Sequence, residues 1–431
     1  MNSGFGLSAA ARAALLARLN RGRNDTPAPE APRGFRELPG QREMALIRDA
    51  AASLALENPF FRAHEGTASA HSIIAGREVI NFGSYNYLGL NGDPRVQAAA
   101  KAAIDQHGVS ASASRMVSGE RPLHGALEAA LAAHYRAQGA LVFVSGHATN
   151  VTVIGHLLGP RDLMVHDAAI HNSCTEGARL SGAKRLSFPH NDWRAAEAAL
   201  AEARRGARHA LLVIEGHYSM DGDIPDLPRF IEVARRHDAW LMVDEAHALG
   251  VVGTRGHGLH EHFGIDPNEV DIWMGTLSKT LSACGGYIAG NASLIEWLKH
   301  SAPGFVYSVG LAPALAAAAL ESLAILHAEP DRVARLQANA ALFLELARDA
   351  GFDTGSATAH AIIPVILGSS IAAARYSQLL FARGINVQPI LYPAVAEKAA
   401  RLRFFLSSEH AEADIRATIA ALIAIREEAK G

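Results

Sequence analysis

Asp271-Ile-Trp-Met-Gly-Thr-Leu-Ser-Lys-Thr-Leu-Ser-Ala-Cys-Gly-Gly286 is the most informative stretch of this sequence. The apolar run Val270–Met274 predicts a buried strand that ends at Gly275, and Lys279 follows among small hydroxyl residues. Because the lysine ammonium is strongly hydrated, burying it is costly. A lysine just past a core strand, with no carboxylate beside it, indicates an amine that attacks a carbonyl group. Taken alone, however, the stretch favours a surface lysine on a strand–helix loop.

The composition is that of an ordinary globular enzyme. The chain has 431 residues, enough for one large and one smaller domain, with 49% apolar and 19% charged residues. Its net charge of -3 argues against nucleic-acid binding. The two cysteines, Cys174 and Cys284, predict no disulfide framework. No apolar run reaches membrane-spanning length, so we expect a cytoplasmic protein. An organelle transit peptide in the Ala- and Arg-rich N-terminus is the alternative.

Between about residues 125 and 290, short β-rich segments alternate with helical ones. Such alternation predicts a mostly parallel sheet with helices on both faces, whose ligand lies beyond the carboxyl ends of the strands. A second, smaller α/β block follows a long helical region at 311–350. The expected strands of the two blocks are Ala140–Ser145, Asp162–His166, Ala210–Glu215, Trp240–Asp244, Val270–Met274 and Tyr287–Ala289, then Ile362–Leu367, Ile385–Ile390 and Leu402–Leu406.

Metal chemistry is not expected, although the chain has 21 histidines. Neither HExxH nor paired CxxC motifs occur in the sequence. We interpret the run His257-Gly-Leu-His260-Glu-His262 as a solvated glycine-rich loop. The sequence therefore predicts no metal site.

Trp240-Leu-Met-Val-Asp244-Glu-Ala-His247 places a carboxylate at the end of a buried strand and an imidazole three residues later. Each alone has a simpler explanation, a helix cap for the Asp and a satisfied core polar residue for the His. Together with Lys279 they suit pyridoxal phosphate, because a carboxylate can keep the pyridine nitrogen protonated and make the ring an electron sink. His247 would then donate to the phenolic oxygen of the ring, and Lys279 would hold the aldehyde carbon.

From about Asn81 to the C-terminus, the chain resembles the α-oxoamine synthase family of fold-type I pyridoxal-phosphate enzymes. The motifs that carry the resemblance are Asn-Phe-Gly-Ser-Tyr-Asn-Tyr-Leu-Gly-Leu (81–90), Ser-Gly-His-Ala-Thr-Asn (145–150), Glu-Gly-His-Tyr-Ser-Met-Asp-Gly-Asp (215–223), Asp-Glu-Ala-His (244–247) and Gly-Thr-Leu-Ser-Lys (275–279). The resemblance implies an α/β fold with a mostly parallel large-domain sheet and a smaller C-terminal α/β domain. The expected parts are an N-terminal arm, linker and extended region (1–80), a large cofactor-binding domain (81–305) and a small domain (306–431).

The resemblance also implies roles for individual residues. Lys279 would bind the cofactor and later act as the base at the substrate Cα, with His171 stacked on the cofactor ring. The implied catalytic residues are Lys279, His171, Asp244 and His247. Further cofactor contacts are expected from Ser145, Gly146, His147, Ser219, Thr276 and Ser278, of which Ser145, Gly146, Thr276 and Ser278 would hold the phosphate. His147 replaces the usual Phe or Tyr, and Gly310 replaces a frequent hydroxyl residue. Arg403 would hold the amino-acid carboxylate, and Asn86 is a second expected substrate contact.

The implied reaction is a decarboxylating condensation of an amino acid with an acyl thioester, giving an α-amino ketone. Gln388–Pro393 resembles aminolevulinate synthases, but Ala394 replaces their succinyl-binding threonine. Residues 85–89 and 117–124 resemble bacterial members that use serine or a carrier protein. We therefore predict a serine palmitoyltransferase-like enzyme of sphingolipid synthesis that makes a 3-ketosphinganine-like product. The alternative is 8-amino-7-oxononanoate synthase, which joins L-alanine and a pimeloyl thioester in biotin synthesis.

Two other classes of protein stay open from the sequence. An aminotransferase would share the fold and Lys279 but would release no carbon dioxide, whereas a non-catalytic partner subunit would be expected to lack the lysine. The family resemblance further implies a homodimer with active sites at its interface. The acyl donor would be acyl-coenzyme A or an acyl carrier protein.

Residues 7–23 have the spacing of a basic amphipathic helix. Its simpler role is to pack on the dimer surface. The alternative hypothesis is that it docks an acidic acyl carrier protein or an anionic membrane face, through charge attraction that weakens with salt. Deleting residues 1–34 should then reduce turnover with carrier-protein or lipid-presented donors, more so at low salt. Equal turnover of truncated and full-length enzyme with every donor would leave only the packing role.

Overall fold

The computed structural model describes residues 34–35 and 38–428, which fall in two compact units, 1–58 and 59–431. In the first unit, the structure contains helix α2 (Pro39–Ser53). The predicted helix at 7–23 lies outside the described residues. Within the part of the chain that the structure describes, no helix has the length and apolar character needed to cross a bilayer.

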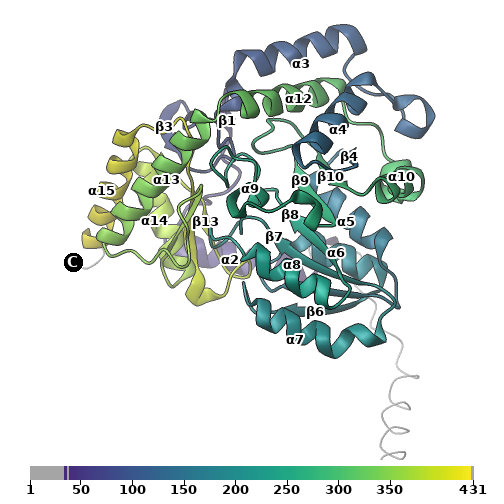
Figure 1. The fold of residues 1–431 in the computed structure, drawn as a ribbon. Helices are drawn as coiled ribbons and strands as arrows, with labels where there is room; N and C mark the ends of the chain where they lie inside the picture. The colour runs from purple at the N-terminus through teal and green to yellow at the C-terminus, as the bar shows by residue number, and fades with distance from the viewer. Residues whose placement is uncertain (1–33, 36–37, 429–431) are drawn as a thin grey trace, which may run out of the picture. The chain divides into compact units, whose positions relative to one another are not determined.

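The second unit is built on a seven-stranded sheet with the order β4-β10-β9-β8-β7-β5-β6 (Figure 1). Its strands are β4 (Gly139–Phe143), β5 (Leu163–Asp167), β6 (Lys184–Phe188), β7 (Ala210–Glu215), β8 (Trp240–Asp244), β9 (Ile272–Thr276) and β10 (Gly286–Gly290). Strands β5 to β9 pair in parallel, whereas β10 runs antiparallel to both β4 and β9. The predicted mostly parallel sheet is therefore confirmed.

Helices bury both faces of this sheet, as its continuous apolar strands require. Alternate residues of β7 belong to different cores: Leu211 and Val213 to one, Leu212 and Ile214 to the other. Each such side chain contributes about 1.5–3 kcal/mol by its burial. The helices of this region are α3 (Pro94–His107), α4 (Pro122–His134), α5 (Gly146–Leu157), α6 (Asn172–Ser181), α7 (Trp193–Ala203), α8 (Leu227–Arg236), α9 (Leu259–Phe263), α10 (Ala292–Ser301), α11 (Pro303–Val306) and α12 (Pro313–Ala328).

The C-terminal segment forms a three-stranded antiparallel sheet, β11 (Ile362–Ile366), β14 (Arg401–Phe405) and β13 (Pro389–Ile390). With it lie helices α13 (Asp331–Asp349), α14 (Ser370–Ala382) and α15 (Glu412–Glu428) (Figure 1). This arrangement confirms the predicted smaller α/β block and brings Arg403 into the middle of an ordered strand.

A separate four-stranded sheet joins residues far apart in the chain. It has the order β1 (His64–Glu65), β2 (His71–Ile74), β3 (Arg77–Asn81) and β12 (Ile385–Asn386), and the last pair is parallel. The single strand expected at Ile385–Ile390 is thus wrong. It is two short strands, β12 and β13, in different sheets, because residues 385–386 hydrogen-bond to β3 and residues 389–390 to β14.

Candidate active site

The carboxyl ends of neighbouring strands in the large sheet meet at a cavity of about 400 Å³. Asp244 ends β8, Thr276 ends β9 and Glu215 ends β7. The predicted site residues that line this cavity are Ser145, Gly146, His147, His171, Ser219, Asp244, His247, Thr276, Ser278, Lys279 and Arg403. Residues distant in sequence are therefore brought together at the edge of the sheet that the strand order predicts.

Asn86 is the predicted site residue that does not line this cavity. It lines a neighbouring cavity of about 390 Å³, whose walls include Tyr85, Ser278 and Lys279. Its Oδ1 accepts a hydrogen bond from the backbone N–H of Asn91, at 3.1 Å, and its Nδ2 is buried with no partner among the described residues. Asn86 is thus placed on another side of Lys279 from the remaining predicted residues.

Lys279 lies three residues beyond β9, at the wall between the two cavities. No salt bridge joins its amine to a carboxylate among the described residues, and its Nζ lies 5.6 Å from the centre of the Tyr85 ring. Burial lowers the pKa of Lys279 to about 8, and the carboxyl groups of Asp244 and Glu215 offset only part of that effect. With that pKa, roughly a tenth of the amine is unprotonated at pH 7, and this is the form that acts as a nucleophile or base.

Asp244 is held by a chain of polar contacts. Its Oδ2 accepts from Asn150 Nδ2 at 2.8 Å, and its Oδ1 accepts from the backbone N–H of Ala246 at 3.0 Å. Asn150 also donates to Ser173 Oγ at 3.0 Å, and that hydroxyl lies 2.7 Å from His171 Nδ1. Since the backbone N–H of Ser173 also points at His171 Nδ1, this nitrogen acts as the acceptor. The carboxylate and the imidazole are thereby oriented by one network.

His247 is paired with Tyr87, whose hydroxyl lies 2.7 Å from His247 Nδ1. Burial lowers the pKa of His247 well below its usual value, and the positive charges of Lys279 and Arg403 lower it further. Burial also raises the pKa of Tyr87, so the phenol keeps its proton. When Tyr87 donates to Nδ1, the Nε2–H of neutral His247 is free to donate into the cavity.

A site suited to a phosphate lies at the start of helix α5. Ser145 is its N-cap and accepts from the backbone N–H of Ala148, at 3.3 Å. A Cβ on Gly146 would come within 2.7 Å of Thr276 Oγ1, so glycine lets the helix terminus approach β9 closely. Thr276 Oγ1 in turn lies 2.8 Å from Ser278 Oγ. A helix N-terminus beside several hydroxyls binds a dianion favourably.

Arg403 reaches this cavity from β14 of the small sheet. Its Nη1 donates to the backbone carbonyl of Ser219 at 2.9 Å, and its guanidinium lies 4.7 Å from the centre of the Phe405 ring. Its Nε is buried without a hydrogen-bond partner in the described structure. A guanidinium at a cavity wall with an unpartnered Nε–H suits a carboxylate ligand.

We expect Arg403→Ala to weaken amino-acid binding by roughly 10²-fold or more, because a buried carboxylate that loses its charged partner forfeits on the order of 3 kcal/mol. The bound cofactor should be retained. Titration of the cofactor absorbance with amino acid measures the affinity. Arg375→Ala, on helix α14 and outside the cavity lining, is the control. Unchanged affinity in Arg403→Ala would show that Arg403 does not hold the carboxylate.

Several cavity residues were not predicted from the sequence: Tyr85, Asn150, Ser173, Glu215, Met220, Ala246, Met274, Cys284 and Gly285. Glu215 is buried, and burial together with the charge of Asp244 raises its pKa to about 8. Glu215 is the last residue of β7 and the first residue of a motif that carries the family resemblance. Its position at a strand end within that motif is the sequence feature that could have identified it as a site residue. Asn150 closes another such motif, one turn beyond Gly146. For Glu215 and Asn150, however, the residues that each contacts cannot be identified from the sequence alone, because they come from distant parts of the chain.

His147 lies at the cavity mouth, with its ring edge-on to His171 at 6.2 Å between ring centres. The family's aromatic position is therefore occupied by an imidazole that can still pack beside the stacking histidine.

The residues present fit pyridoxal phosphate. They offer hydroxyls and a helix N-terminus for the phosphate, a carboxylate for the ring nitrogen, an imidazole N–H for the phenolic oxygen and a lysine for the aldehyde. The buried Nε of Arg403 and Oε1 of Glu215, both without partners in the described structure, also line or adjoin this space. Roles for individual residues stay predictions at this point.

Comparison with known proteins gives the same family. A model described as aminotransferase class I and II matches residues 77–422. The 8-amino-7-oxononanoate synthase of Methylobacterium nodulans is 42% identical over 357 residues, covering 83% of this chain and 89% of that protein. The enzyme of the same name from Geobacter sulfurreducens is 39% identical over 395 residues, covering 91% and 97%.

The solved structure of Sphingomonas wittichii serine palmitoyltransferase has a TM-score of 0.86 to this chain at 32% identity, covering 90% of this chain and 97% of that one. Both named activities fall within the family that the motifs indicate. This chain therefore belongs to the aminotransferase class I and II family and, within it, to the α-oxoamine synthases, acyltransferases that depend on pyridoxal phosphate.

Proposed function

We propose that this enzyme is an 8-amino-7-oxononanoate synthase, which condenses L-alanine with a pimeloyl thioester and releases carbon dioxide. The observation that carries the proposal is the identity of about 40% to enzymes of that name along more than four-fifths of the chain. Serine palmitoyltransferase, the activity that the motifs favour, is supported by structural similarity at 30–32% identity. Gln388–Pro393 also lacks the Arg-Pro-Pro common in soluble serine palmitoyltransferases.

In the proposed mechanism, bound pyridoxal phosphate supplies an electron sink for negative charge at the amino-acid Cα. Arg403 would hold the substrate carboxylate, while the N-terminus of α5 with Thr276 and Ser278 would bind the cofactor phosphate. Asp244, oriented by Asn150, would supply the negative charge that keeps the ring nitrogen protonated. His247, oriented by Tyr87, would donate its Nε2–H to the phenolic oxygen.

Lys279 moves the proton at the substrate Cα in this mechanism. Its pKa of about 8 lies close to physiological pH, where a general base can accept a proton and later return it. The Cα attacks the carbonyl carbon of the acyl thioester, the C–S bond breaks and the thiol of the donor leaves. Carbon dioxide is then lost, and reprotonation at the Cα gives the α-amino ketone.

The test is a matrix of glycine, alanine, serine and threonine against acetyl, succinyl, pimeloyl and palmitoyl thioesters, each as coenzyme A and carrier-protein forms. Products are identified by mass spectrometry and kcat/KM is measured for each pair. We expect alanine with pimeloyl donor to exceed serine with palmitoyl donor by roughly 10²-fold. The highest kcat/KM with serine and palmitoyl donor would instead establish a serine palmitoyltransferase. A cytoplasmic location is part of the proposal and follows from biotin synthesis.

We further propose a homodimer. Val109, Val117 and Tyr307 are exposed by 74%, 80% and 86%. Their two segments adjoin, because the backbone N–H of Gly310 donates to the carbonyl of Ala113 at 2.9 Å. Exposed apolar side chains gathered in this way favour an interface between proteins.

Close packing explains why glycine occupies position 310, where the family often has a hydroxyl residue. A Cβ there would lie 3.0 Å from the carbonyl oxygen of Gly119 and 3.1 Å from Ala111 Cβ. Ser308 would then be the residue whose hydroxyl contacts the cofactor phosphate bound in the other subunit.

Sedimentation at assay concentration should show a dimer, and Val117→Glu should shift it toward monomer with a matching loss of activity, because a charge would be buried in the interface. Glu412→Ala, at an exposed position of α15, is the control. A monomer that keeps full activity would contradict the shared active site.

A further inference from the structure

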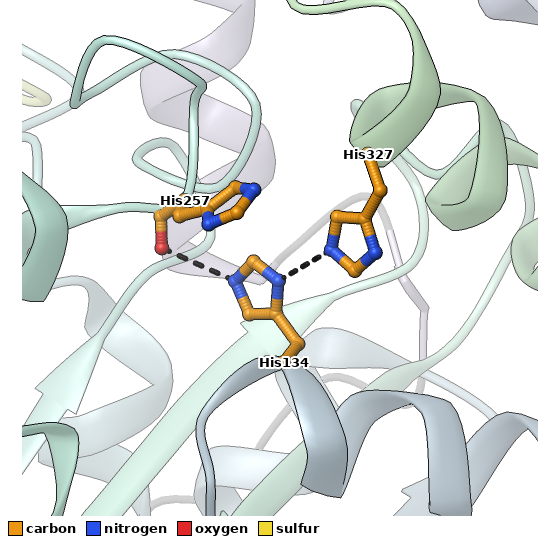
Figure 2. A group of neighbouring side chains, drawn as sticks. All are labelled: His134, His257 and His327. Carbon is orange, nitrogen blue, oxygen red and sulfur yellow. Dashed lines mark hydrogen bonds between the residues drawn. The ribbon is translucent and has the colours of Figure 1, made fainter.

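Three histidines from separate parts of the chain meet outside the reaction cavity (Figure 2). His134 is the last residue of α4, His327 lies one residue before the end of α12, and His257 lies in the loop between β8 and α9. One ring nitrogen of each lies within 4.8 Å of the others, and His134 is buried. The fold therefore brings together three imidazoles that do not belong to a common sequence motif.

The hydrogen bonds of His134 give it the tautomer of a metal ligand. Its Nε2 lies 3.1 Å from the backbone carbonyl of His257, which can only accept, so Nε2 carries the proton (Figure 2). Its Nδ1 is then unprotonated and points toward Nε2 of His327, at 2.9 Å. Ligating histidines usually donate their other N–H to such a carbonyl, which orients the ring and raises its basicity.

His257 adds a second, independent observation. Its Nε2 is buried and has no hydrogen-bond partner within the described structure, which is unfavourable for a polar atom and leaves it available to a ligand. Its backbone is held in place, because its N–H donates to Glu261 Oε2 at 3.0 Å and Gly258 N–H donates to the Val252 carbonyl at 2.9 Å. The ring can therefore turn about its side-chain bonds while the loop stays fixed.

The imidazoles are held in the neutral, ligating form. Burial is the main cause that lowers the pKa of His134, His257 and His327. Repulsion from His257, His260 and His327 further lowers the pKa of His134, and repulsion from His257 further lowers that of His327. The positive charge of Arg255 lowers the pKa of His257 and His327, whereas Glu261 raises that of His257. Neutral imidazole is the form that binds a transition metal.

We propose that His134, His257 and His327 bind a divalent transition-metal ion that prefers nitrogen ligands, with Zn²⁺ as the first candidate. Three neutral imidazoles suit Zn²⁺, Ni²⁺ or Cu²⁺ and do not suit Mg²⁺ or Ca²⁺, which prefer oxygen. Zn–N bonds of roughly 2.0–2.1 Å in a tetrahedron place nitrogens about 3.3 Å apart. The 2.9 Å separation of His134 and His327 must widen slightly, and the ring of His257 must turn inward.

The ion would join the ends of α4 and α12 to the loop that follows Asp244 and His247. Its role is to hold that loop, because none of its ligands lines the reaction cavity. Glu245, next to Asp244, accepts from the backbone N–H of Leu259 at 3.0 Å, so the two ends of the loop are already tied to each other. A metal ion bound to His257 would additionally fix the middle of this loop to the ends of α4 and α12.

The test uses the full chain with its cofactor bound, treated with a chelator, desalted and titrated with Zn²⁺ or Co²⁺. Mass spectrometry of the metal should find about one Zn²⁺ per chain, and Co²⁺ should give the strong visible absorption of a four-coordinate nitrogen site. His257→Ala and His327→Ala should each weaken binding at least roughly tenfold. Zn²⁺ should raise the melting temperature of the wild type and of neither variant.

His300→Ala, an exposed histidine on α10, is the matched control and should bind as the wild type does. Cofactor absorbance and the melting transition without metal confirm that each variant is folded. Wild-type protein that holds no metal after desalting, or equal metal loading in wild type and both cluster variants, would overturn the proposal.

Discussion

Replacing Lys279 with alanine should lower turnover by roughly 10³-fold or more and abolish covalent attachment of the cofactor. The variant loses both the nucleophile for the aldehyde and the base for the Cα proton. No other lysine lines the cavity within the described residues. Borohydride reduction of the wild-type enzyme followed by peptide mapping should place the label on the peptide that contains Lys279. Steady-state kinetics of Lys279→Ala then measures the loss.

Lys184→Ala is the matched control for that experiment. Lys184 begins the edge strand β6 and is exposed, so its removal should change turnover by less than about twofold. A label on Lys184 or Lys299, or a Lys279→Ala enzyme that keeps its turnover, would show that the assignment of Lys279 is wrong.

Asp244→Asn should lower kcat by roughly 10²- to 10³-fold, because it removes the one negative charge that can keep the ring nitrogen protonated. The fold should tolerate the change. Asn has the same volume, and the buried Oδ1 of Asn150, which has no partner in the described structure, can turn to accept from the new amide. Loss of the long-wavelength cofactor absorbance with substrate, at unchanged melting temperature, is the expected signature.

Glu215→Gln is the matched control for Asp244→Asn. Both carboxyls are buried and line the same cavity, but the pKa of Glu215 is raised to about 8, so this group is already neutral at pH 7. Replacing it with an amide should change kcat at pH 7 by only a few fold. A loss as large as that of Asp244→Asn, or an Asp244→Asn enzyme of nearly wild-type kcat, would contradict the division of roles.

The strands that sequence analysis located best are those buried on both faces. The predicted bounds of Ala210–Glu215 and Trp240–Asp244 match β7 and β8, because runs of apolar residues mark central parallel strands. Strand β6, Lys184–Phe188, was not predicted. It lies at the sheet edge with mostly exposed or half-exposed residues, so it has no apolar run to reveal it. Ser145, expected at the end of a strand, is instead the cap of α5.

The active-site residues also differ in how well the sequence predicts them. Lys279, Asp244 and His247 stand in short motifs with chemistry of their own, so sequence was enough to place them together. The partners that orient them come from elsewhere: Asn150 is 94 residues from Asp244, and Tyr87 is 160 residues from His247. The members of the histidine cluster are still further apart in the sequence, because His134 and His327 are separated by 193 positions. Contacts of this range depend on the sheet order, which local pattern does not specify.

The parallel pairing of β3 with β12 has a consequence for synthesis on the ribosome. Asn81 and Asn386, which are joined through their side chains at 2.9 Å, are 305 residues apart. At roughly 5–20 residues per second, translation needs about 15–60 s to deliver the partner strand. Throughout that interval one edge of β3 has no β12 to pair with, and such an edge can join another chain. Residues 77–81 therefore stay without this partner strand until about nine-tenths of the chain has been made.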